Sequence, residues 1–144
     1  MLKCLWQNEW LDMVQKTNKG KALCNIKNKI EYWPWTSHKN RLVESALARL
    51  RIGHVGLNKH LFRFNLSSTD QCLCGNTETI EHFLLICPIQ NQNRIKLKKS
   101  LDTLGVPLTV GNVLGGGDFP RNIQFDILNE VSRFLLESGK LGTL

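Results

Sequence analysis

The sequence lacks an apolar run long enough to cross a bilayer. A transmembrane helix needs about 20 predominantly apolar residues, whereas the longest uncharged apolar runs, such as Phe83 to Cys87, are far shorter. The chain also lacks a secretion signal, because its first residues reach Glu9 and Asp12 before an apolar signal core can form. These absences predict an intracellular protein that is not inserted in a membrane.

Motifs for phosphate chemistry are missing as well. The chain contains neither G-x-x-x-x-G-K-[ST] nor G-x-G-x-x-G, so a nucleotide-binding loop has no support. Its 12 acidic residues are scattered and no two aspartates are adjacent, whereas metal-assisted phosphoryl transfer needs convergent carboxylates. We therefore predict that this chain is not an enzyme, with neither polymerase nor nuclease activity and no small-molecule substrate.

What is present fits one globular domain. The 144 residues are 42% hydrophobic and 22% charged, which is typical of a folded protein. The net charge is +7, and the basic excess falls in residues 1–70. Such a surface favours a polyanion, RNA or DNA, as the partner. The alternative is a lysine-rich surface that only keeps the protein in solution.

Apolar residues recur at helical spacing along most of the chain. The spacing predicts helices over residues 5–16, 36–52 and 57–64, around Leu97–Leu104, and from Asp118 to Gly139. Asn8 can cap the first of these, either Thr36 or Ser37 the second, and Asp118 the last. Gly53 suits the C-terminal end of the second helix.

Three cysteines and one histidine lie close together in the sequence with the spacing C-x-C-x7-H-x4-C: Cys72, Cys74, His82 and Cys87. Three thiolates and one imidazole are a common ligand set for tetrahedral structural zinc. Gly75 allows a tight turn that aims the first two sulfurs at one ion, and Thr77 can cap a short helix that carries His82. Four protein ligands leave no position for water or substrate, so the predicted cofactor is one structural Zn²⁺.

The last ligand needs a special backbone. Cys87 follows His82 by five residues, which is more than one α-helical turn, so we expect it where the helix unwinds before Pro88. The alternative to a metal site is that the cysteines are small buried hydrophobes and His82 is a core histidine. We interpret the lone cysteines, Cys4 and Cys24, in that way. A Cys87–His82 nucleophile pair is a weaker interpretation, because it uses only half of the cluster.

The fold class that follows is mostly α: a small helical domain of five to six helices with one irregular insert, a CCHC zinc knuckle. We divide the chain into an N-terminal helix with an extended segment (1–35), a helical core with the zinc motif at 72–87 (36–110), and a glycine-rich joint with a C-terminal amphipathic helix (111–144). The extended part is EYWPW at 31–35, since Pro34 disfavours helix at the residue before it. Gly115–Gly117 favour neither helix nor strand, so the joint is expected to be flexible.

Three stretches carry a resemblance to a known family. They are the LxRLRxGH-like segment at Leu47–His54, the L-N-x-x-L at Leu57–Leu61, and CxCG…ETIEHFLLxCP over the cluster. This run resembles the zinc-binding tail of non-LTR, jockey-like retrotransposon polyproteins, which follows their reverse transcriptase and RNase H domains. WQNEW at Trp6–Trp10 looks like the segment just after RNase H, and FLLESGKL at Phe134–Leu141 is similar to the C-terminal stretch.

The resemblance implies a zinc-stabilised, non-catalytic tail module that binds RNA or DNA, template RNA being the natural ligand. It implies the cluster residues as zinc ligands and a nuclear or cytoplasmic ribonucleoprotein setting. The cations best placed to meet phosphates are Lys39, Arg41, Arg49, Arg51, Lys59 and Arg63. The aromatic residues that can stack on unpaired bases, with burial in the core as the alternative, are Trp33, Trp35, Phe62 and Phe64.

Two other functions remain open. The amphipathic stripe Ile123–Leu135 favours a structural or interaction module that docks on an RNase H or reverse transcriptase domain, with packing inside the chain as its alternative. The other interpretation is that the chain is a fragment of a decayed element without a function of its own.

Overall fold

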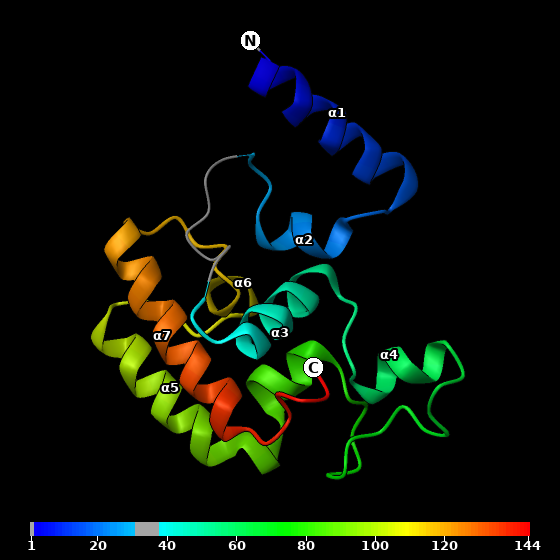
Figure 1. The fold of residues 1–144 in the computed structure, drawn as a ribbon, viewed down its shortest axis with the longest axis vertical. Helices are drawn as coiled ribbons and strands as arrows, with labels where there is room; N and C mark the ends of the chain where they lie inside the picture. The colour runs from blue at the N-terminus through cyan, green and yellow to red at the C-terminus, as the bar shows by residue number, and fades with distance from the viewer. Residues whose placement is uncertain (1, 31–37) are drawn as a thin grey trace.

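The computed structural model describes residues 2–30 and 38–144. These residues are mostly helical, as predicted, and within them β-pairing is limited to an isolated bridge between Gln71 and Thr77 (Figure 1). The longer helices are α1 (Leu2–Thr17), α3 (Arg41–Ile52), α5 (Asn91–Thr103) and α7 (Arg121–Glu137). The shorter ones are α2 (Lys21–Ile26), α4 (Asn58–Arg63), the π-helix η2 (His82–Ile86), the 3₁₀ helix η3 (Pro88–Gln90) and α6 (Val110–Val113).

The core lies between α3, α5 and α7. α5 and α7 run side by side, and α3 packs against α7 (Figure 1). The buried stripes consist of Val43, Ala46, Leu47 and Leu50 on α3, Leu97 and Leu101 on α5, and Ile127, Leu128, Val131, Phe134 and Leu135 on α7. Each buried Val, Leu, Ile or Phe side chain contributes about 1.5–3 kcal/mol when it leaves water. Phe83 of η2 meets Phe134 with ring centroids 5.6 Å apart, so the segment that carries the cysteine cluster is anchored in this core.

Three helix starts differ from the prediction. α1 begins at Leu2, so Asn8 lies inside the helix and does not cap it. α3 begins at Arg41, and the Asn40 side chain caps it by accepting hydrogen bonds from the amides of Leu42 and Val43. α7 begins at Arg121 without a side-chain cap, so the predicted cap at Asp118 is wrong. The predicted caps Thr36 and Ser37, and the extended EYWPW segment, lie outside the described residues.

The glycine-rich stretch is packed where a flexible joint was expected. Residues 110–113 form α6, and Val113 and Leu114 are fully buried. Gly116 passes so close to α2 that a Cβ there would lie 2.0 Å from the Ile26 carbonyl oxygen. The glycines therefore allow a close backbone approach, a use that composition alone does not distinguish from flexibility.

The N-terminal helix α1 packs loosely on this body. α1 projects away from it (Figure 1), and Val14 is its buried residue, whereas Leu5 and Trp6 are more than half exposed. The Gln7 side chain holds the chain after α2, because its amide donates to the Asn28 carbonyl and its oxygen accepts from the Ile30 amide. Sequence analysis missed α2, a short helix with no regular apolar stripe.

Candidate metal centre

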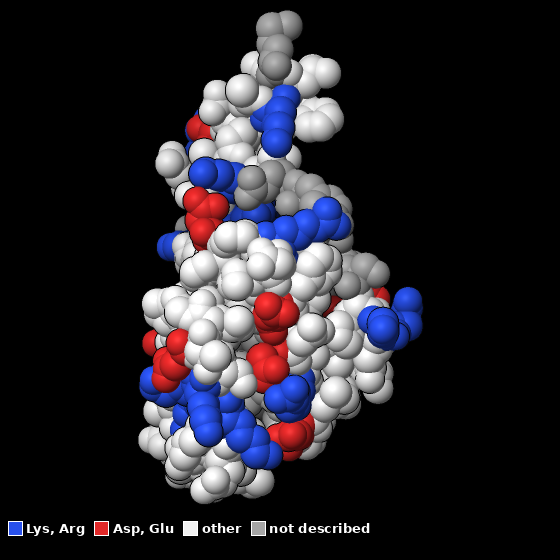
Figure 2. Space-filling model, turned by 90° about the vertical axis from the view of Figure 1, so that its left-hand side faces the viewer, with Lys and Arg blue, Asp and Glu red and all other residues white. Residues whose placement is uncertain are grey.

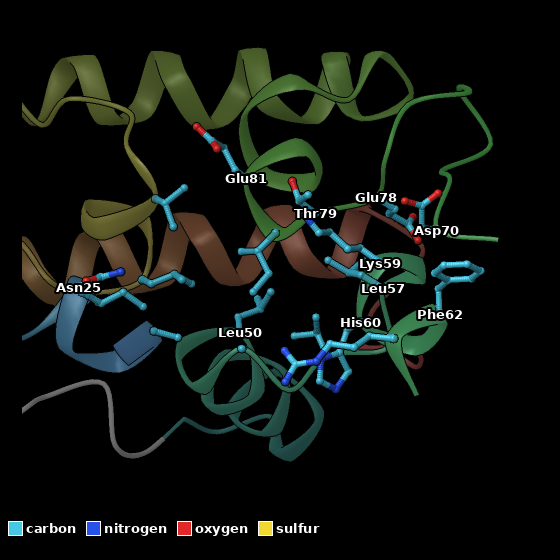
Figure 3. A pocket seen from close by; sticks show the side chains of 18 of the residues that line it. Asn25, Leu50, Leu57, Lys59, His60, Phe62, Asp70, Glu78, Thr79 and Glu81 are labelled. Carbon is cyan, nitrogen blue, oxygen red and sulfur yellow. The ribbon is translucent and has the colours of Figure 1, made fainter. Parts of the chain in front are cut away.

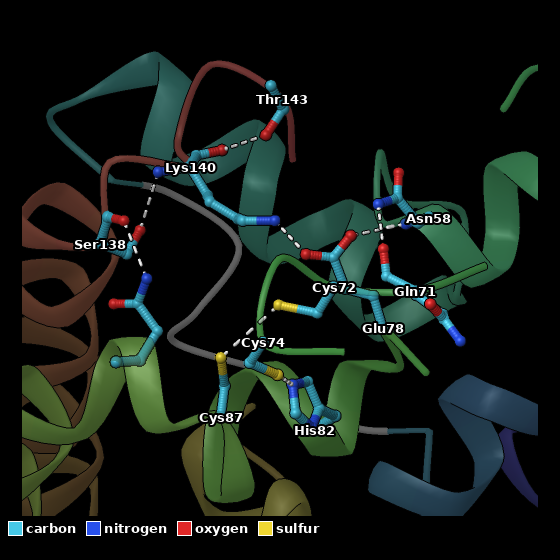
Figure 4. A network of polar contacts seen from close by, with 11 residues as sticks. Asn58, Gln71, Cys72, Cys74, Glu78, His82, Cys87, Ser138, Lys140 and Thr143 are labelled. Carbon is cyan, nitrogen blue, oxygen red and sulfur yellow. Dashed lines mark hydrogen bonds and ion pairs between the residues drawn. The ribbon is translucent and has the colours of Figure 1, made fainter. Parts of the chain in front are cut away.

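The first two cysteines lie on a tight hairpin turn, as predicted. Gly75 has a φ of 88°, which residues with a Cβ rarely adopt, and its amide donates to the Cys72 carbonyl at 2.9 Å. The Cys72 amide donates to the Asn76 carbonyl at 2.7 Å. These bonds bend the backbone so that the sulfurs of Cys72 and Cys74 face the same cluster (Figure 4).

A π-helical turn places the other two ligands. In η2 the Cys87 amide donates to the His82 carbonyl at 2.7 Å, an i→i+5 bond that makes the turn one residue wider than in an α-helix. Residues five apart therefore come to the same side, which is how the expected unwinding at Cys87 is realised. The His82 amide donates to Thr79 Oγ1 at 2.9 Å, so the side chain that caps this turn is Thr79 and not the predicted Thr77.

The four ligand atoms form one compact group and all lie within 4.8 Å of one another. The sulfurs of Cys72 and Cys87 are 3.7 Å apart, and Cys74 Sγ lies 3.2 Å from His82 Nε2. Sulfurs on a tetrahedral zinc with bonds of about 2.3 Å are separated by about 3.8 Å, whereas a disulfide needs about 2.05 Å. The group can hold one metal ion, and a tetrahedron of these four ligands would have no open position.

The centre is shielded from solvent on most sides. Cys72, His82 and Cys87 are buried and Cys74 is half-buried. Burial raises the pKa of Cys72 to about 11, while the hydrogen bond from the Asn76 backbone lowers the pKa of Cys74. Without a cation the buried thiol is neutral at pH 7, so metal binding must displace its proton.

A buried carboxylate braces the cluster from the side. Glu78 is 2% exposed; its carboxylate accepts from the Asn58 amide at 2.8 Å and from the Lys140 ammonium group (Figure 4). Asn58 in turn donates through its side chain to the Gln71 carbonyl at 2.6 Å. These bonds join the hairpin to α4 and to the segment after α7, which explains structurally why an asparagine stands at the start of α4.

A guanidinium group supports the last ligand. Arg94 of α5 donates from Nη1 to the Cys87 carbonyl at 2.9 Å and from Nη2 to the Ile86 carbonyl at 3.5 Å. Carbonyls at the end of a helical turn have no partner within the helix, so this side chain satisfies them and fixes the backbone on which Cys87 sits. Sequence analysis missed both Glu78 and Arg94. Glu78 lies within the motif, but its role depends on the distant Lys140, and only the fold brings Arg94 to the cluster.

The predicted phosphate contacts do not all lie free at the surface. Lys39, Arg41, Lys59 and Arg63 are exposed. Arg49 is exposed, but it donates to the Leu144 carbonyl at 3.0 Å. Arg51 is 6% exposed and donates through Nε to the Leu114 carbonyl at 3.1 Å, and burial lowers its pKa to about 10. Arg51 is thus a structural residue, and its prediction as a phosphate contact is corrected.

Charge is unevenly distributed over the surface. On the face in Figure 2, basic side chains gather near the N-terminal helices and again lower down, where α5 lies, and acidic side chains lie beside both groups. Two lysines of α5 are paired with acidic side chains: Lys96 with Glu137 at 2.9 Å and Lys98 with Asp102 at 2.7 Å. Exposed pairs of this kind reduce the net field that a polyanion would meet on α5.

A cavity of about 780 Å³ adjoins the centre, between the end of α3, α4 and α6 (Figure 3). Leu50 and Leu57 contribute to its apolar wall, and Lys59 and His60 of α4 stand on one side, facing Glu81 across it. The four cluster residues do not line this cavity. The metal centre and the cavity are therefore separate features, and the cavity is lined by Asp70 and Glu78, which flank the hairpin.

Other predicted residues have different surroundings from those expected. Cys4 is exposed. Cys24 is half-buried. The burial interpretation of lone cysteines is therefore wrong for Cys4.

In the part of the chain that the structure describes, no helix combines the length and the apolar character that a membrane span requires. Comparison of the chain with protein-family models, with curated proteins and with solved structures finds no match.

Proposed function

We propose that this chain is a zinc-stabilised, non-catalytic module that binds nucleic acid. The observation that carries the proposal is the Cys₃His group, whose ligand atoms lie within 4.8 Å of one another. Three sulfurs and one imidazole nitrogen are soft and borderline ligands that favour zinc over magnesium or calcium. A fully ligated ion supplies folding energy and no reactive position, so the metal would be structural.

The nucleic-acid part of the proposal rests on charge. From Ser45 to Thr69 the chain contains no acidic residue, and Lys59 and Arg63 of α4 are exposed within this span. Exposed cations neutralise phosphates and release counterions, so binding would be strongly salt-dependent and largely independent of sequence. The resemblance to retrotransposon tails adds template RNA as the expected ligand and a ribonucleoprotein as the expected setting.

Metal content tests the first part. Protein purified under reducing conditions should contain about one zinc per chain, as a site of this type holds. Cys72→Ser and Cys87→Ser should each lose the metal and the cooperative thermal unfolding transition, because metal binding here is folding energy. Cys4→Ser is the matched control, since Cys4 is exposed and outside the cluster; it should keep both. Full stability without metal would refute a structural zinc site.

Salt-titrated binding tests the second part. The parent should bind RNA or DNA with an affinity that falls steeply between about 50 and 200 mM salt. Lys59→Gln with Arg63→Gln should weaken binding to all sequences. The control removes the same charge from cations that already pair with acids, through Lys16→Gln with Arg133→Gln, and should have a smaller effect. An affinity that ignores salt would contradict this part.

A protein-interaction module that docks on an RNase H or reverse transcriptase domain is the second candidate. α7 no longer motivates it, because the stripe from Ile127 to Leu135 is buried in the core. α1 does, since Leu2, Leu5 and Trp6 are all more than half exposed on a helix that projects from the body. Light scattering coupled to size exclusion should show a stable complex when such a domain is added, and a purely monomeric chain would count against it.

A further inference from the structure

Three aromatic rings make an edge-to-face contact (interplanar angle 65°) and a tilted contact (55°) beside α4. The ring centroids of His54 and His60 are 5.1 Å apart, and those of His60 and Phe64 are 4.9 Å apart. The guanidinium carbon of Arg63 lies 5.4 Å from the centroid of Phe64. We call the three rings His54, His60 and Phe64 the ring ladder. Ring separations of about 4.5–7 Å are those of attractive aromatic pairs.

Local backbone signals hold the ladder in place. His60 and Phe64 are four residues apart and therefore neighbours on one helix face. α4 ends in a Schellman motif, in which Asn65 has a φ of 57° and the Leu66 amide donates to the Leu61 carbonyl at 2.9 Å. His54 follows Gly53, whose left-handed conformation ends α3. The rings thus stand on fixed helix ends and not on a free loop.

The open end of the ladder is accessible. Phe64 is 49% exposed and His54 is exposed, so another flat ring has room beside them. Burial, together with the neighbouring His54 and Arg63, lowers the pKa of His60, which favours the neutral imidazole in the ring ladder. Phe64 offers a π-face and Arg63 a planar cation that also meets phosphate.

We propose that the ring ladder is a stacking site for unpaired nucleobases, so that the ligand of this module is single-stranded nucleic acid. The inference rests on the proposed nucleic-acid binding and deepens it. Bases stack on Phe64 and extend the ladder, while Arg63 and Lys59 contact the phosphates on the same side of α4. Asp70 and Glu81 line the adjoining cavity, so the backbone runs outside it. A duplex, whose bases are already stacked, has no exposed ring face to offer.

The test compares the affinities for a single strand and for a duplex, and the effects of substituting two different phenylalanines. Fluorescence anisotropy at fixed salt measures the affinity for a 12-nucleotide RNA and for the duplex of the same sequence. Phe64→Leu keeps apolar bulk but removes the π-face, and it should weaken single-strand binding about five- to tenfold without changing duplex binding. Phe125→Leu is the matched control, because Phe125 is 38% exposed and Arg121 lies 5.6 Å from its ring centroid on α7; it should bind like the parent.

A second variant separates stacking from folding. Phe64→Tyr retains the aromatic face and should stay within about twofold of the parent, with the zinc content and unfolding temperature of all variants measured alongside. Equal affinities of parent and Phe64→Leu for the single strand, or an equal loss for strand and duplex, would overturn the stacking site and leave the proposed function standing. A parent that binds neither nucleic acid would overturn both.

Discussion

Two helices of nearly equal length, α1 with 16 residues and α7 with 17, differ strongly in how much of their apolar surface is buried. α7 buries Ile127, Val131 and Leu135 completely, whereas α1 buries Val14 and leaves Leu5 more than half exposed. Both sequences carry apolar residues at helical spacing. The spacing of apolar residues therefore predicts that a helix has an apolar face, but whether that face is buried depends on segments distant in the sequence.

The partners of the two helices explain the difference. α7 packs against α3, α5 and α6, while α1 contacts α2. Phe83, which follows the ligand His82 directly, adds its ring to Phe134 of α7. The metal centre is consequently part of the body that surrounds α7, and its effect on stability should reach α7 but not α1. Each prediction below tests one side of this contrast.

Removal of a metal ligand should have the largest effect. Cys87→Ser leaves three ligands around a buried ion site, and we expect a loss of several kcal/mol or of folding altogether. Hydrogen exchange should show that amides of α7 lose protection, while amides of α1 exchange quickly in the parent and in the variant. Equal α7 protection with and without metal would break the link between the centre and the core.

Truncation in the core of α7 should come next. Leu135 is fully buried and Leu136 is 51% exposed, so these neighbours form a matched pair. Leu135→Ala should lower the free energy of unfolding by about 2–5 kcal/mol, and Leu136→Ala should change it by no more than about 0.5 kcal/mol. Chemical denaturation of the zinc-loaded proteins measures both. Similar losses for the two would mean that α7 is not oriented as described.

The buried carboxylate of the hairpin should contribute less. Glu78→Gln removes the charge that meets Lys140, and breaking a buried pair costs about 3–5 kcal/mol. Because the Lys140 side chain is 29% exposed, solvent screening lowers our expectation to about 1–3 kcal/mol. Glu137→Gln is the control, since its pair with Lys96 is exposed on both sides; it should cost under about 1 kcal/mol. Denaturation midpoints that do not separate the two variants would contradict the bracing role.

Arg94 should affect the metal more than the fold. Arg94→Met keeps the length of the side chain but removes the guanidinium donor from the Cys87 carbonyl, which keeps the Gln90 amide as a donor at 3.2 Å. Partners that orient metal ligands typically change metal affinity about 10–100-fold, and we expect the lower end because the bond reaches the backbone and not the sulfur. Competition with a chelator measures the affinity. Arg133→Met, in an exposed pair on α7, should leave it unchanged.

The residues that sequence analysis placed well are those whose information is local. The helical spacing of Leu47 and Leu50 predicts the buried face of α3, and the turn at Gly75 with its flanking cysteines predicts the hairpin. The cluster residues come together as expected because their spacing is compatible with one turn and one short helix. Local chemistry was therefore sufficient for the centre itself.

Two of the errors depend on contacts between distant segments. Arg51 carries a charge and occupies a helix, yet it is buried against the Leu114 carbonyl of a segment 63 residues away. Gly116 was interpreted as flexible, but its use is the close approach to Ile26. Neither a buried arginine nor a packing glycine has a signature within a short window, because the partner is defined only by the fold.

The smallest expected effect concerns α1 and sharpens the contrast most. Leu5 is 53% exposed, so Leu5→Ala should change the free energy of unfolding by no more than about 0.5 kcal/mol, although the same truncation at Leu135 is expected to cost several times more. Denaturation of the isolated chain measures this. A loss above about 1 kcal/mol would show that α1 is covered in solution, and its dependence on protein concentration would then identify a second copy as the cover. An unchanged stability leaves the apolar side of α1 free for a partner.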